Sequence, residues 1–512
     1  MFTLGLLYQD QMILQRNQEI RILGTTTPAN LITGVLEDVT STATADASGS
    51  FVLTFPKRES GRHLTLTISD DTQEVTLHDI SIGDIYIAGG QSNMEFFLQY
   101  EAHWADAKAD AACNPASQNI HLFNVPQICF EGHTSRQNDA YGHWFTPDVT
   151  DDLACFSAPG YYFAKEINAK EDVPVGIIGC NWGGSTATAW LPASELEDCD
   201  LSCYLQEYAD ACALYSEEEM KRISLEAWVW EDSKENGEAF APLLYGRDRN
   251  WQLDYIKRCA HNPVIPMGPY NINRPGGLYS TMLERIIGFP CLGVLWYQGE
   301  SDSGLGHAKF YDQLLKKLIA HWRKVWNYDL YFFIVQLAPF GVWLECSDED
   351  YATVRQRQRQ VADEDDRVGM ASILDLGSYY DIHPKEKKEV GRRLSLLARK
   401  MIYGEDLLCE GPRLTAIEHT GRTELTLHYD GGTVLTQDSC INDIRVQLDG
   451  QQGLVESYQL SAMDLILTVP ALALAPTGTA ITVDVGTADY GELHIHNEAG
   501  LAMQPGAMTI RI

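Results

Sequence analysis

A serine follows two glycines at the end of a short apolar stretch, in the segment Asp84-Ile-Tyr-Ile-Ala-Gly-Gly-Gln-Ser-Asn-Met94. The glycines permit a tight turn from a strand into a helix. Such a turn would hold the Ser92 hydroxyl at the carboxyl end of a sheet, where open α/β folds bind ligands. The amide groups and positive potential of a helix N-terminus would favour a developing oxyanion there. These features make Ser92 a candidate nucleophile, and a simple helix N-cap is the alternative interpretation.

Two later segments also combine an expected strand end with a glycine and a possible oxyanion donor. They are Gly179-Cys-Asn-Trp-Gly-Gly-Ser185 and Leu295-Trp-Tyr-Gln-Gly-Glu-Ser-Asp302. Gly184 could present its backbone N–H with no side chain in the way, and Gln298 carries a neutral amide donor. A plain glycine-rich turn is the alternative for the first segment.

The carboxylates of Glu300 and Asp302 allow two interpretations. They could orient the loop that carries Gln298, or they could form the acid/base pair of a glycosidase. Glycosidase carboxylates must flank a sugar at several ångströms, whereas these two lie on one short loop. The spacing therefore favours the orienting role.

A histidine and a carboxylate lie close together in Asp381-Ile-His383, just before a stretch with apolar residues at helical spacing. Asp381 could bind the imidazole Nδ1–H, fix the tautomer and leave Nε2 of His383 to accept a serine proton. Asp375, which follows the apolar run 370–374, is the competing carboxylate. A role within its own loop is the alternative for Asp375.

The elements that position these residues follow from the hydrophobic pattern. Residues 1–80 alternate as β-strands do, which predicts an N-terminal β-sandwich segment. Residues 81–405 alternate short apolar strands with helical stretches, which is typical of a parallel sheet covered on both faces. Within them, about 193–265 is acidic and helix-prone and is expected to be an insertion. Residues 406–512 return to β alternation and predict a C-terminal β-rich segment.

Length and charge restrict the class of protein. The 512 residues predict two or three domains, and the net charge of −33 disfavours nucleic acid and anionic membranes as partners. The sequence shows no signal peptide pattern and no bilayer-spanning apolar run. The 12 cysteines are interpreted as reduced thiols, so a cytoplasmic location is expected. Two strand histidines, His494 and His496, make a poor zinc site, and we expect them at the surface. No metal is expected.

In chain order, the four segments resemble the sequence blocks of SGNH hydrolases, and more narrowly those of sialate O-acetylesterase-like carbohydrate esterases. The resemblance extends over nearly the whole chain and is weakest in 193–265. The further matching segments are Gln9–Arg16, Ser157–Phe163, Arg274–Tyr279, Phe333–Pro339 and Asn497–Leu501.

The resemblance implies an α/β fold with an SGNH-type (flavodoxin-like) three-layer core and flanking β-sandwich-like segments. It implies that Ser92 is the nucleophile and His383 the general base. The amides of Ser92 and Gly184 and the side chain of Gln298 would form the oxyanion hole. The superfamily's Asp-x-x-His block would place the acid at residue 380, which is a tyrosine, so we assign the acid to Asp381. The glutamine form of the third block is similar to that of acetylxylan esterases.

The resulting hypothesis is a serine-dependent carbohydrate O-acetylesterase that needs no cofactor. Acetylated xylo- or manno-oligosaccharides and O-acetyl sialic acid are all compatible substrates. A non-catalytic carbohydrate-binding protein on the same fold is the main alternative, and a glycoside hydrolase using Glu300 and Asp302 is a weaker one. The sequence carries no indication of oligomeric state.

Overall fold

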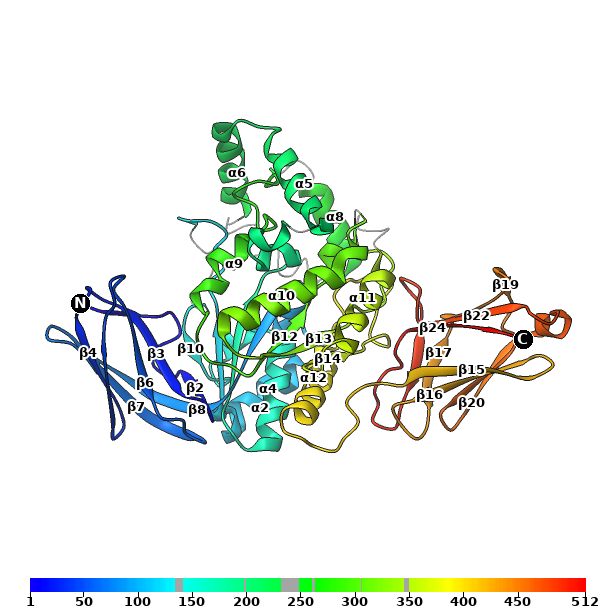
Figure 1. The fold of residues 1–512 in the computed structure, drawn as a ribbon, viewed down its shortest axis with the longest axis horizontal. Coiled ribbons are helices and arrows are strands. Elements are labelled where there is room, and N and C mark those ends of the chain that lie inside the picture. The colour runs from blue at the N-terminus through cyan, green and yellow to red at the C-terminus, as the bar shows by residue number, and fades with distance from the viewer. Residues whose placement is uncertain (134–140, 198, 232–247, 260–262, 305, 345–349) are drawn as a thin grey trace. The chain divides into compact units, whose positions relative to one another are not determined.

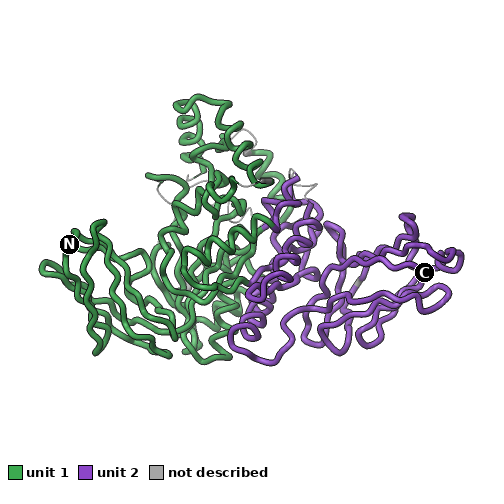
Figure 2. Tube along the Cα trace, viewed as in Figure 1, with its two compact units in different colours: residues 1–298, 313–332 green, residues 299–312, 333–512 purple. Residues whose placement is uncertain are grey.

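The computed structural model describes residues 1–133, 141–197, 199–231, 248–259, 263–304, 306–344 and 350–512. The chain forms two compact units, each made of two stretches of sequence (Figure 2). Unit 1 comprises Met1–Gln298 and Gln313–Phe332, and unit 2 comprises Gly299–Asp312 and Phe333–Ile512.

Unit 1 begins with short β-strands (Figure 1). In Leu31–Leu36 and Ser50–Phe55, buried side chains alternate with more exposed ones, as in strands with one packed face. This confirms the predicted β alternation. The short strands are β1 (Thr3–Leu4), β2 (Ile13–Gln15), β3 (Ile20–Thr25), β4 (Leu31–Leu36), β5 (Val39–Thr44), β6 (Ser50–Phe55) and β7 (Gly61–Ser69).

The long strand β8 (Glu74–Gly90) runs through the boundary predicted at residue 80. Its first half pairs antiparallel with β7, and its second half pairs parallel with β11 (Val175–Asn181) and β12 (Gly293–Tyr297). Beyond β11, β9 (Ile120–Asn124) is also parallel, whereas β10 (Trp144–Phe145) joins β9 antiparallel. The inner strands are therefore parallel as predicted, but the central sheet as a whole is mixed.

Helices cover both faces of this sheet in unit 1. Phe163 of α4 (Ala158–Glu171) packs on Tyr86, with ring centroids 4.7 Å apart, and Trp322 of α10 (Tyr311–Trp326) packs on Trp296 at 5.8 Å. Trp296 pairs in register with Gly89, and alternation along β8 puts residues 86 and 89 on opposite faces. The helices α4 and α10 therefore cover opposite faces.

The other helices of unit 1 include three in the predicted insertion, whose helical character is confirmed where the structure describes it. Residues 198, 232–247 and 260–262 of that stretch lie outside the described residues. The helices are α1 (Ser92–Glu95), α2 (Trp104–Cys113), α3 (Thr150–Ala154), α5 (Ser202–Cys212), α6 (Glu217–Glu231), α8 (Arg249–Cys259) and α9 (Gly277–Thr281). Among the described residues, no helix is both long enough and apolar enough to cross a membrane.

Unit 2 continues the α/β pattern and ends in β-sheets. The α/β elements are α11 (Tyr351–Asp363), β14 (Val368–Ala371) and α12 (Lys387–Met401), and β13 (Tyr331–Val335) enters the unit at Phe333. Val390, Leu394 and Leu397 of α12 are fully buried, as their spacing predicts.

The C-terminal strands form two four-stranded sheets, β15-β16-β21-β20 and β19-β18-β22-β24, and one two-stranded sheet, β17-β23. Leucines of the first sheet and valines and isoleucines of the second share one buried core, so this part is sandwich-like. The strands are β15 (Arg413–Gly421), β16 (Glu424–Asp430), β17 (Thr436–Ile441), β18 (Ile444–Leu448), β19 (Gln451–Gly453), β20 (Ser457–Ser461), β21 (Asp464–Thr468), β22 (Ala480–Val485), β23 (Leu493–His496) and β24 (Gly506–Arg511).

Candidate active site

Ser92 lies at the turn that the sequence predicts, directly after β8. Gly90 has φ +132°, and a Cβ there would overlap the carbonyl oxygen of Tyr297, so no other residue fits this turn without strain. The N–H of Gln91 donates to that same oxygen at 3.1 Å. Gln91 takes the N-cap position and Ser92 is the first residue of α1, so Ser92 is not the N-cap. Because α1 is a single turn, it contributes only a small helix dipole.

The loop after β11 lies against this turn. The N–H of Trp182 donates to the carbonyl of Gly90 at 3.1 Å, which joins the ends of the two strands. Gly184 has φ +75°, and a Cβ there would contact nothing within 4 Å. Glycine is therefore required at 184 by backbone conformation and not by close packing.

Two residues that the sequence analysis did not select hold this loop in place. The Glu95 carboxylate, three residues after Ser92, accepts a hydrogen bond from the N–H of Gly183 at 2.6 Å. The Asn273 side chain donates to the carbonyl of Gly184 at 3.1 Å and accepts from the N–H of Thr186 at 2.8 Å. In the sequence, Glu95 stands out only as a carboxylate three residues after the candidate nucleophile. Asn273 has no such signal.

Gln298 is fully buried at the end of β12. Its Nε2 donates to Oε1 of Gln91 and to the carbonyl of Ser185, both at 3.2 Å. These two acceptors account for both amide hydrogens. In this geometry Gln298 ties the serine turn to the Gly184 loop, which is a positioning role that the sequence analysis did not anticipate.

Unit 2 carries His383 and Asp381, which the sequence analysis paired. His383 is 3% exposed, and the Trp343 indole packs edge-on against its ring, with centroids 5.2 Å apart. Burial, followed by the charges of Lys387 and Lys385, lowers the pKa of His383 well below its usual value. The imidazole is therefore neutral at pH 7, the form that can accept a proton.

Asp381 binds the backbone of His383 more closely than its ring. Its Oδ1 accepts a hydrogen bond from the His383 N–H at 2.9 Å and lies 3.8 Å from Nδ1. The second distance is too long for a hydrogen bond. Burial raises the pKa of Asp381, and the backbone hydrogen bond from His383 partly offsets this effect.

Asp375, the competing carboxylate, is held by other partners. Arg393 of α12 donates to both of its oxygens, at 2.7 and 2.6 Å, and His496 Nε2 lies 3.0 Å from Oδ2. Burial alone would raise the pKa of Asp375, but these hydrogen bonds outweigh burial and hold the pKa far below its usual value. These partners lie on α12 and β23, outside the loop of Asp375, so its role differs from the role within its own loop that was its expected alternative. The expected surface position of His496 is wrong, because its side chain is 8% exposed.

Glu300 and Asp302 share one short 3₁₀ turn, Glu300–Asp302, and both are buried in unit 2. Their placement on one turn agrees with the argument against a glycosidase pair.

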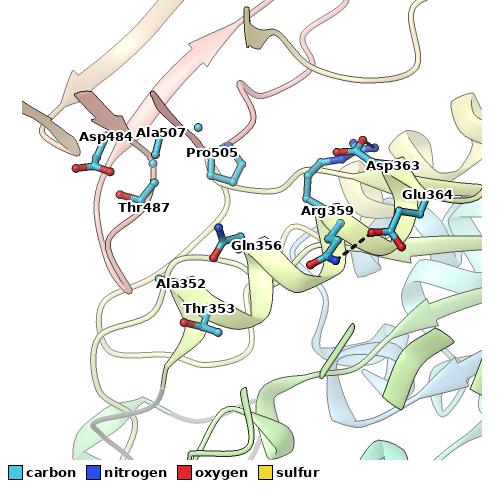
Figure 3. A pocket seen from close by; sticks show the side chains of 13 residues that line it. Ala352, Thr353, Gln356, Arg359, Asp363, Glu364, Asp484, Thr487, Pro505 and Ala507 are labelled. Atoms are coloured by element: carbon cyan, nitrogen blue, oxygen red, sulfur yellow. Dashed lines mark hydrogen bonds and ion pairs between the residues drawn. The ribbon is translucent and has the colours of Figure 1, made fainter. Parts of the chain in front are cut away.

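A cavity of about 660 Å³ lies in unit 2 between α11 and the loops next to β22 and β24 (Figure 3). Its charged lining includes Arg359, which is paired with Asp363 at 2.6 Å. The described lining does not include His383 or Asp381. We therefore do not assign this cavity to the candidate active site.

Comparison with known proteins adds the family context. Residues 82–233 and 266–400 match the family described as carbohydrate esterase, sialic acid-specific acetylesterase. Those two stretches contain every residue assigned to the candidate site.

Among curated relatives, the sialate O-acetylesterase of Rattus norvegicus is 25% identical over 384 residues, covering 70% of this chain and 65% of the relative. The human sialate O-acetylesterase is 23% identical over 393 residues, covering 72% and 63%. The chain therefore spans slightly less than two thirds of these relatives. A solved structure of a carbohydrate acetylesterase from Xanthomonas citri is 26% identical, covers 99% of both chains and has a TM-score of 0.73.

Proposed function

Because this chain belongs to the carbohydrate esterase family of sialic acid-specific acetylesterases, we propose that it is a serine-dependent esterase that removes O-acetyl groups from a carbohydrate. The observation that carries the proposal is the strained turn at Gly90, which puts Ser92 at the carboxyl end of β8 beside the Gly184 loop. We also propose that the α/β part has the SGNH layout, since β9, β11, β8 and β12 are parallel and helices cover both sheet faces.

The proposed reaction is a two-step acyl transfer. The Ser92 Oγ attacks the acetyl carbonyl while Nε2 of His383 takes the hydroxyl proton. The tetrahedral intermediate collapses, the bond to the sugar oxygen breaks, and His383 returns the proton to that oxygen. Water then attacks the acetyl-serine with His383 again as base, which releases acetate and restores Ser92.

The oxyanion would be stabilised by the backbone N–H groups of Ser92 and Gly184 and by the Gln298 amide. For this, Gln298 would exchange one of its two hydrogen bonds, to Gln91 or to Ser185, for a bond to the oxyanion. The hydrogen bonds from Gly183 to Glu95 and from Asn273 to Gly184 support this role for the loop, because they fix its backbone before substrate arrives. Preorganised donors lower the barrier because they need not reorient as charge develops.

We propose that Asp381 positions the base. Its hydrogen bond to the His383 N–H fixes the backbone from which the imidazole projects. The neutral imidazole that burial favours supports its assignment as general base near pH 7.

The substrate class is an O-acetylated saccharide. The net charge of −33 favours neutral oligosaccharides over polyanions, while the names of the curated relatives point to O-acetyl sialic acid. A panel of acetylated xylo-oligosaccharides, acetylated manno-oligosaccharides and O-acetyl sialic acid covers both possibilities.

The test is acetate release from this panel and from 4-nitrophenyl acetate by the wild type and by Ser92→Ala. The substitution should reduce the rate to below about one per cent, given the size of nucleophile effects. Ser81→Ala is the matched control, because Ser81 is also buried on β8. It lies where the parallel pairing of β8 begins, at the opposite end from Ser92. Hydrolysis that survives in Ser92→Ala would contradict nucleophilic catalysis by Ser92.

A further inference from the structure

Three tyrosines of unit 2 form an aromatic surface next to the turn that carries His383. Tyr379 and Tyr380 immediately precede that turn and are 44% and 54% exposed. The ring of Tyr379 meets those of Tyr380 and Tyr490 edge-to-face, with centroids 4.7 and 5.0 Å apart. We call Tyr379, Tyr380 and Tyr490 the tyrosine platform.

The platform is linked to the candidate base through one short segment. The carbonyl of Tyr379 accepts a hydrogen bond from the N–H of Val342 at 2.7 Å. The next residue, Trp343, is the one that packs on the His383 ring. A Cβ at Gly341 would overlap the Tyr379 ring, so the absence of a side chain there leaves room for the ring. The platform and the imidazole therefore share one local framework.

Tyr490 comes from the C-terminal β part, on the loop between β22 and β23, and this loop is firmly held. The guanidinium of Arg355, 1% exposed, donates to the carbonyls of Ala488 and Asp489. The Asp489 carbonyl also accepts from the N–H of Phe340 at 2.9 Å. Burial lowers the pKa of Arg355 to about 10, so it stays charged at pH 7. Tyr490 is thus fixed beside Tyr379 by contacts that begin in α11.

The chemistry of this surface suits a sugar ring. An aromatic face carries negative charge density and attracts the polarised C–H groups on one face of a pyranose, while the phenol hydroxyls can bond its hydroxyls. The Tyr490 hydroxyl lies 3.5 Å from the Glu492 carboxylate, which adds an acceptor for sugar O–H groups. Purely apolar side chains would fit a lipid or protein surface better than three rings that each carry a hydroxyl.

We propose that the tyrosine platform is a saccharide-binding subsite, on which a pyranose ring of the acetylated substrate stacks. The proposal rests on the esterase function proposed above. It gives the C-terminal β part a role in the substrate site through Tyr490, a residue outside the stretches that match the family.

The test compares the wild type with Tyr490→Ala and Tyr380→Ala on acetylated xylo- or manno-oligosaccharides and on 4-nitrophenyl acetate, which has no sugar. Each variant should lose about tenfold more kcat/KM on the oligosaccharide than on 4-nitrophenyl acetate, mainly through KM, because stacking contributes to binding. Tyr490→Phe keeps the ring and should retain most of the activity. Tyr458→Ala is the matched control, because Tyr458 is an exposed tyrosine (37%) on β20 of the same unit.

A binding measurement separates this inference from the proposed function. Calorimetry with the deacetylated oligosaccharide does not require hydrolysis, and Tyr490→Ala should weaken its binding relative to Tyr458→Ala. If the wild type releases no acetate but shows this difference, the esterase proposal fails and the subsite stands. Equal losses on both substrates, or unchanged oligosaccharide binding in Tyr490→Ala and in Tyr380→Ala, would overturn the subsite. Tyr380→Ala keeps the test valid if Tyr490→Ala unfolds, since Tyr380 is the most exposed of the three.

Discussion

The Asp381 carboxylate accepts a hydrogen bond from the backbone N–H of His383 at 2.9 Å, while it lies 3.8 Å from the imidazole Nδ1 of the same residue. An acid of a serine triad binds the ring and fixes its tautomer. Here the short contact fixes the backbone instead.

The first prediction follows from this geometry. Asp381→Asn keeps an oxygen that can accept from the His383 N–H, so kcat should fall by less than about tenfold. Asp381→Ala removes the acceptor and should cost more. Steady-state kinetics on 4-nitrophenyl acetate measure both. A loss of several orders of magnitude in Asp381→Asn would mean that the carboxylate binds the ring during catalysis, as a triad acid does.

The pH dependence of kcat/KM should report the lowered pKa of His383. A general base works only when unprotonated, so activity is lost as pH falls through its pKa. Because burial lowers that pKa, the acidic limb of the pH profile of kcat/KM should have its midpoint below pH 6.5, the usual pKa of a histidine. Lys385→Met removes one of the charges that lower the pKa and should shift the limb upward. A limb at pH 7 or above would be inconsistent with a buried neutral imidazole.

Gln298→Ala should lower kcat by about 10² to 10³ with little change in KM, since an oxyanion donor acts on charge that exists only in the transition state. The structure adds a second expectation. Loss of the bonds to Gln91 and Ser185 should also lower the melting temperature. A lower melting temperature with unchanged kcat would leave Gln298 as a tether between the two loops only.

Asp375→Asn should destabilise the fold without a comparable effect on kcat. Asp375 is nearly buried and pairs with Arg393, and breaking a buried ion pair typically costs about 3–5 kcal/mol. The pKa of Asp375 is depressed, so its contribution is present above the usual pKa of an aspartate and is lost as pH falls toward the folded-state value. Urea unfolding at pH 7 and at pH 3 measures both effects. A large fall in kcat in the folded variant would restore Asp375 as a candidate acid.

The features that the sequence predicted correctly are local ones. A pair of glycines before Ser92 specifies a strand-to-helix turn because only glycine tolerates the φ of +132° at Gly90. The apolar spacing from Val390 onward specifies a helix with one buried face. In both cases the residues that determine the structure lie within a few positions of each other.

The features that the sequence did not reveal depend on residues far apart in the chain. Asn273 fixes the carbonyl of Gly184, 89 residues away, and His496 binds Asp375 from 121 residues away. Periodicity carries no information about such pairs. For Asp381, two residues from its partner, spacing does not distinguish a contact with the imidazole Nδ1, which lies 3.8 Å away, from the 2.9 Å hydrogen bond with the backbone N–H.

Trp343 provides the last prediction, because it is the aromatic residue that packs on His383. Its Nε1 is buried and has no acceptor among the described residues, so the indole is held there by packing. Trp343→Ala would let water reach the imidazole and reduce the desolvation that lowers its pKa, so the acidic limb of kcat/KM should move to higher pH. Trp343→Phe keeps a ring against His383 and should leave the limb near its wild-type position. A structural role alone would lower the melting temperature in both variants and leave the limb unmoved. If Trp343→Ala has the wild-type limb, burial by Trp343 is not what keeps His383 neutral.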